Sequence, residues 1–145
     1  MIESIIYGVL KADTPLQNIL GATQSDSKIY PDNANPGNLP CIVYYADQPT
    51  NPNNEPWGYQ QNITFEFWAK TKTESLAIRN RLYTIFNKFD RFFNSSAMAQ
   101  GIIIRECHAV PAQLTNNFQL ETEQAINAVV SFDFQFTKCA QAQGE

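Results

Sequence analysis

The sequence predicts one α+β domain, in which an antiparallel or mixed sheet of about four main strands carries two helices on one face, joined by long polar loops. Apolar residues recur at helical spacing in two segments, and they alternate or run continuously in four others. The segments follow the order helix, strand, strand, helix, strand, strand. The 145 residues fit a single core, and a 43% hydrophobic content with 12% aromatic residues can fill it without disulfides or metals.

The first segment is helical over about residues 2–20. Its apolar residues fall at positions i, i+3, i+4, i+7 and i+8 on one stripe: Ile2, Ile5, Ile6, Val9 and Leu10. Asp13-Thr14-Pro15 supplies a capping residue and a proline suited to a first helical turn, and Gly21 is a natural stop. We therefore expect a kinked helix or a pair of helices.

Two strands follow a long loop. Residues 21–40 are rich in Pro, Asn and Asp and leave only a short extended segment at Ile29-Tyr30-Pro31. Cys41 to Ala46 is β-branched and aromatic and predicts a buried strand. Residues 63–70 alternate, with one dry face and one wet face. The dry face holds Ile63, Phe65, Phe67 and Ala69, and the wet face holds Thr64, Glu66, Trp68 and Lys70.

The second half of the chain again predicts a helix followed by two strands. Thr71 and Glu74 have capping-box spacing, and the apolar residues after them predict a helix over 72–91. Strands are expected over 102–109 and 128–137, the second with Phe132, Phe134 and Phe136 on one face. We predict the polar stretch 112–127 as a second long, flexible connection, and 138–145 as a polar tail.

Aromatic and amide residues indicate where partners would bind. Residues 48–58 contain three prolines and three asparagines and predict a flexible loop, and aromatic residues on such a loop are common interface anchors. Trp68 stands on the solvent-facing side of the strand, which indicates that a loop of the same chain or a neighbouring subunit covers it. The alternative is a single exposed aromatic side chain, which is common on protein surfaces. The candidate interface residues are Asn54, Trp57, Tyr59, Glu66, Trp68 and Phe118.

Composition excludes several functions. A formal net charge of −4 argues against a domain that grips nucleic acid, which needs a clustered basic footprint. The 14 asparagines and 12 glutamines outnumber the charged residues and concentrate in the expected loops. We expect no transmembrane span and no secretory signal. The three cysteines fit reduced thiols in a cytoplasm.

Catalytic patterns are weak throughout. Cys107 and His108 are adjacent, so on a strand they point to opposite faces and cannot share a metal ion without a bulge. Glu66 and Asp133 would form a carboxylate pair if their strands were neighbours, although a solvated sheet face explains both. No phosphate-binding glycine loop or nucleophile elbow occurs. We therefore expect no catalytic, cofactor-binding or metal-binding residues.

The ordered set of segments resembles the tail-completion or tail-terminator proteins of long-tailed bacteriophages and prophages. An apolar N-terminal helix precedes KIYPDNANPGNLPCIVYY, then ITFEFWAKTKTESLAIRNRLYTIF, and AVVSFDFQF closes the domain. The resemblance covers most of residues 2–137. It is carried by Ile29, Tyr30, Pro31, Leu39, Pro40 and Tyr44 in the first part, and by Phe65, Ala69, Thr71, Glu74 and Leu82 in the second.

The resemblance implies a structural role in a virion. Such proteins form a ring, usually a homohexamer, that caps the finished tail tube and presents a surface to the head connector or stopper protein. The expected partners are further copies of the chain, the major tail tube protein and the connector, with DNA passing through the lumen unbound. The ring would assemble in the cytoplasm of a bacterial host.

Two alternatives remain at this point. The chain could be a head-side stopper or adaptor of the same neck region. It could instead be a small-molecule-binding or enzymatic domain whose aromatic sheet face forms a pocket, with Glu66, Asp133 or His108 as polar groups. A core closed by its own phenylalanines would exclude that pocket.

Overall fold

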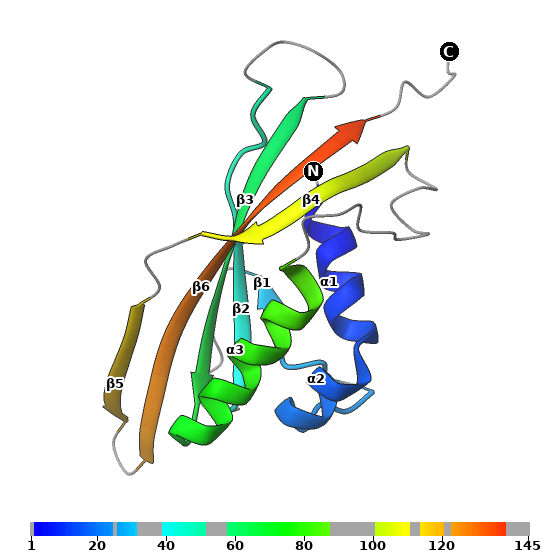
Figure 1. Ribbon diagram of the computed structural model, residues 1–145. Coiled ribbons are helices and arrows are strands. Elements are labelled where there is room, and N and C mark those ends of the chain that lie inside the picture. Colours follow the sequence, from blue (N-terminus) through cyan, green and yellow to red (C-terminus); the bar gives the residue numbers. More distant parts are fainter. Residues whose placement is uncertain are drawn as a thin grey trace.

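A computed structural model describes residues 2–24, 26–31, 39–51, 58–87, 101–110, 114–120 and 123–138, the backbone alone at 114–120 and 123–124. Three helices and six strands lie in these ranges (Figure 1). In chain order they are α1 (Glu3–Ala12), α2 (Thr14–Leu20), β1 (Ile29–Pro31), β2 (Cys41–Ala46), β3 (Tyr59–Ala69), α3 (Lys72–Phe86), β4 (Ile102–Ala109), β5 (Leu114–Leu120) and β6 (Glu123–Lys138).

The strands form one mixed sheet in the order β1-β2-β3-β6-β4, and β5 also pairs with β6. β1 and β2 are parallel, and the other pairs are antiparallel. β6 is 16 residues long, so β5 pairs with its first half and β4 with its second. The helices lie on one side of the sheet (Figure 1). The predicted α+β class, with helices on one face, is confirmed.

The N-terminal helix pair is confirmed. Asp13 ends α1 and caps α2 by accepting a hydrogen bond from the Leu16 N–H at 3.0 Å. Its carboxylate also receives two hydrogen bonds from the Arg81 guanidinium of α3, at 2.8 and 2.7 Å. Gly21 ends α2 in the left-handed region, at φ 67°, which glycine adopts without strain.

The third helix begins as predicted and ends earlier. The Thr71 hydroxyl accepts the Glu74 N–H at 3.1 Å, while the Glu74 carboxylate accepts the Lys70 N–H at 2.9 Å. The prediction of a helix to residue 91 is wrong, because Asn87 leaves the helical conformation. The Asn87 side chain accepts a hydrogen bond from the Ala109 N–H of β4 at 3.3 Å, which joins the end of α3 to the sheet. Residues 88–91 lie outside the described ranges.

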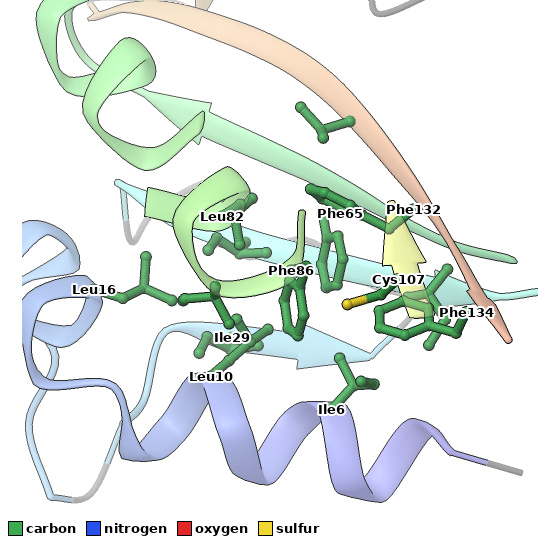
Figure 2. Packing of buried hydrophobic residues seen from close by; sticks show 14 of the residues in the cluster. Ile6, Leu10, Leu16, Ile29, Phe65, Leu82, Phe86, Cys107, Phe132 and Phe134 are labelled. Atoms are coloured by element: carbon green, nitrogen blue, oxygen red, sulfur yellow. The ribbon is translucent and has the colours of Figure 1, made fainter. Parts of the chain in front are cut away.

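The core between helices and sheet is closed by aromatic side chains. Phe86 stacks on Phe65 at 5.5 Å between centroids and meets Phe132 and Phe134 edge-on or tilted at 5.6 and 5.5 Å (Figure 2). These four residues and Phe67 are 0% exposed. These side chains therefore fill the space in which a small-molecule pocket on the aromatic face of the sheet would lie.

The sheet is larger than predicted at 112–127. The prediction of a long connection there is wrong, because β5 and the first residues of β6 form an antiparallel hairpin in this stretch. Three amide residues in β5 hide its alternation, and backbone pairing with β6 supplies what the side-chain pattern lacks. β3 and β6 also begin earlier than expected, since the polar residues at their starts continue existing ladders.

Candidate interaction surface

The sheet has a second face, which the helices do not cover (Figure 1). Register places eight central residues on it, four from β3 and four from β6. We call this the outer face and define it by Asn62, Thr64, Glu66, Trp68, Asn127, Val129, Ser131 and Asp133. It contains two regions of different chemistry, one aromatic and one polar.

The aromatic region is centred on Trp68. Its half-buried side chain packs, together with Tyr30, against a small cluster of Leu39, Cys41 and Ala125, separate from the main core. Cys41 and Asn127 are the strand neighbours of Trp68 in β2 and β6. Residues of the same chain thus cover part of the indole, which leaves the rest accessible to a partner.

The polar region is a hydrogen-bonded row across β3 and β6. Asn62 Nδ2 donates to Asp133 Oδ1 at 2.8 Å, and the Thr64 hydroxyl donates to Asn62 Oδ1 at 3.3 Å. The hydroxyls of Thr64 and Ser131 lie 2.9 Å apart. All four side chains are only partly buried, so the row presents fixed donors and acceptors at the surface.

Glu66 lies between the two regions. It accepts a hydrogen bond from the Tyr45 hydroxyl at 3.2 Å. The carboxylate pair with Asp133 does not form: β3 and β6 are neighbours, but Glu66 pairs with Val129 and Asp133 with Asn62. Four residues of register separate them, about 13 Å along the strands. Two carboxylates so far apart cannot share a proton.

The adjacent residues Cys107 and His108 lie on opposite faces of β4. Cys107 is buried on the helix side, opposite Phe134, while His108 pairs with Asp133 on the outer side. Their predicted separation to opposite faces is confirmed. Within the described ranges, no three His, Cys, Asp or Glu residues cluster to hold a metal ion. No helix in those ranges is long and apolar enough to cross a membrane.

One end of the sheet is hollowed. A cleft of about 440 Å³ lies beside β2 and the start of α1, lined in part by Glu3, Pro31, Ala46 and Asp47. Gln61, which is only 2% exposed, joins the segments beside the cleft by hydrogen bonds. Its amide accepts the Ile2 N–H at 3.3 Å and donates to the Asp47 carbonyl at 2.8 Å and to the Glu3 carboxylate.

The candidate interface residues are dispersed. Glu66 and Trp68 share the outer face, whereas Tyr59 lies on the helix side, where its ring stacks on Phe136 at 5.5 Å. Phe118 pairs with Ala125 in the backbone of β5. Asn54 and Trp57 lie outside the described residues.

The hydrogen-bonded row of Asn62, Thr64 and Ser131 and the buried hydrogen bonds of Gln61 were not predicted from the sequence. The alternation of β3 continues back to Gln61, but a polar amide at a buried position hides this periodicity in the sequence. A search for a buried glutamine in phase with Ile63 and Phe65 would have found it.

These features define a protein domain with a closed core, helices on one face of a sheet and a polar outer face. No family model matches the sequence, and no curated protein matches it. A solved structure described as "Virion of native gene transfer agent (GTA) particle" contains a chain of similar fold, with a TM-score of 0.57 and 12% identity. The match covers 90% of this chain and 90% of that one. At this identity the likeness establishes a shared fold.

Proposed function

We propose that the chain is a structural subunit of a phage-type virion, and that copies of it form a ring that ends the tail tube and joins tail to head. The observation that carries the proposal is the shared fold with a chain of a virion particle over 90% of both chains. The order of the segments in the sequence agrees with it independently. We further propose that the ring is a homohexamer and that the protein is not an enzyme.

The chemistry of the described residues suits such a subunit. Its aromatic core is closed, Glu66 and Asp133 lie far apart, and Cys107 lies on the other face of β4 from His108, whose Nδ1 is 4.0 Å from the Glu106 carboxylate. The outer face of the described residues offers mainly hydrogen-bonding groups on a sheet. Hydrogen-bonded side chains and a half-buried tryptophan are typical of protein interfaces. Contacts with the tail tube protein and the head connector would use such surfaces.

A neck ring must also let DNA pass. A net charge of −4 disfavours phosphate contacts, which supply most non-specific affinity for DNA. We propose that DNA slides through the lumen without specific binding. Basic residues lining the lumen of an assembled ring would contradict this part of the proposal.

Deletion of the gene from its virus or prophage tests the role and its position together. A subunit that ends tail growth predicts tails of uncontrolled length that fail to join heads, restored by the wild-type chain in trans. Tails of normal length beside heads that lose their DNA would favour the second candidate, a head-side stopper or adaptor. Intact particles without the protein would reject both.

A further inference from the structure

Two large hydrophobic side chains are exposed among the described residues, and they lie in different layers of the domain. Tyr45 of β2 and Leu76 of α3 are each 37% exposed. β2 belongs to the sheet, whereas α3 lies on the helix side of it (Figure 1). Single exposed apolar side chains are common on protein surfaces, so the charges around these two decide whether they mark a contact.

The surroundings of Tyr45 are acidic. Tyr45 pairs with Thr64 in register, which places it on the outer face of the sheet. Its hydroxyl donates to the Glu66 carboxylate at 3.2 Å, and Trp68 follows on the same face of β3. The eight residues of the outer face include two carboxylates, Glu66 and Asp133, and no lysine or arginine. This face therefore offers aromatic rings beside negative charge.

The surroundings of Leu76 are basic. Residues three or four apart are neighbours on the surface of a helix, which places Leu76 between Lys72 and Arg79, with Tyr83 next in line. We call these four residues the α3 stripe. Each of them is at least partly exposed. The helix side therefore offers an apolar side chain between two positive charges.

The two cations of the α3 stripe are not neutralised by the described residues. Arg81, elsewhere on the helix, forms an ion pair with Asp13 at 2.7 Å. Neither Lys72 nor Arg79 makes an ion pair or a side-chain hydrogen bond within the described part of the chain. The Arg79 Nε is buried there without a hydrogen-bond partner. A guanidinium binds a carboxylate through two parallel hydrogen bonds, so a carboxylate from another subunit suits this surface.

We propose that the outer face of one copy docks against the α3 stripe of the next copy, and that this contact links the subunits of the ring. The inference rests on the proposed function. The two surfaces have opposite charge, and each places an exposed apolar side chain beside its charges, so they complement each other. Because they lie in different layers of one domain, each copy can bind one neighbour through each surface. This is the head-to-tail arrangement from which closed rings are built.

Charge reversals test this contact, because the two surfaces can be changed separately. Glu66→Lys makes the outer face less acidic, and Arg79→Glu makes the α3 stripe less basic. Each variant alone brings like charges together, so the number of tail tubes that end in a ring, counted by electron microscopy, should fall roughly tenfold. An equimolar mixture of the two variants should recover the rings, because alternating copies in a hexamer restore opposite charges at every contact.

The matched control is Lys138→Glu, which reverses an exposed charge at the last residue of β6. It lies about 30 Å along β6 from Val129, the strand partner of Glu66. This variant should form rings like the wild-type chain. Circular dichroism and thermal unfolding of each purified variant show whether it folds.

Two outcomes overturn the inference while leaving the ring proposal intact. The first is ring formation by either single variant in wild-type numbers. The second is a mixture that forms no more rings than the single variants, which would indicate that the two surfaces bind the tail tube protein or the connector. Absence of rings with the wild-type chain would instead refute the proposed function.

Leu76→Ser tests the apolar part of the contact. Because the side chain is exposed, the Tm of the monomer should stay close to that of the wild-type chain. Ring formation should fall about fivefold, since the neighbouring copy would cover this side chain. Equal ring formation by Leu76→Ser and the wild-type chain would contradict the docking of the α3 stripe.

Discussion

Trp68→Ala separates the cost of folding from the cost of assembly. Truncating a fully buried tryptophan costs about 3–5 kcal/mol, and Trp68 is half-buried against Leu39, Cys41 and Ala125. We therefore expect the free energy of unfolding to fall by about 2 kcal/mol. For a chain of this size that lowers the Tm by roughly 4–8 °C. Guanidinium unfolding of the monomer measures this free energy. It is followed by circular dichroism, because the loss of a tryptophan changes the fluorescence signal.

The remaining accessible part of the indole should act in assembly. If a neighbouring subunit covers it, Trp68→Ala should weaken ring formation by about 2 kcal/mol, roughly 30-fold. Ile78→Val is the matched control, because Ile78 is fully buried in α3 and its truncation costs about 1 kcal/mol without touching the outer face. A loss of about 4 kcal/mol or more in the monomer, with ring formation equal to that of the control, would show that Trp68 serves the fold and takes no part in assembly.

Four other changes test the fold and its electrostatics. Phe86→Ala opens a cavity among three rings and should cost about 3–5 kcal/mol, measured by denaturant unfolding; a loss below 1 kcal/mol would contradict the closed core. Gln61→Leu leaves buried polar partners unsatisfied and should cost about 1–3 kcal/mol, unlike Gln60→Leu at the exposed neighbouring site. Thr71→Ala removes the cap of α3 and should cost about 1 kcal/mol, whereas Thr73→Ala should be nearly neutral. The Arg81 guanidinium, with a smaller contribution from the Leu16 N–H, holds the pKa of Asp13 below its ordinary value against the opposing effect of burial. The stability that this carboxylate contributes is complete above about pH 4, its unfolded pKa, and is lost as the pH falls through its folded pKa. Asp13→Asn should therefore flatten the acid limb of a stability–pH curve, and an unchanged limb would contradict the ion pair.

The sequence predicts those parts of the fold where one physical signal dominates. The cap at Asp13, the stop at Gly21 and the box at Thr71 are local, and the structure has each of them. The alternation from Ile63 onward likewise identifies a strand with one dry face.

Nonlocal pairing accounts for what the sequence did not predict. β5 forms a strand because β6 is long enough to pair with it, and no side-chain pattern within LTNNFQL predicts a strand there. At the end of α3, the Asn87 side chain likewise contacts a distant group, since it accepts a hydrogen bond from the Ala109 N–H of β4. On the outer face, Trp68 was visible as an oddity in the alternation, whereas the row through Asn62 depends on the register between β3 and β6.

Electron microscopy of purified tail tubes incubated with the purified chain tests whether copies of the chain form a ring at the end of the tube. We expect one ring of density at one end of each tube and an arrest of further tube growth. Tubes with unoccupied ends that continue to lengthen in the presence of the protein would contradict it.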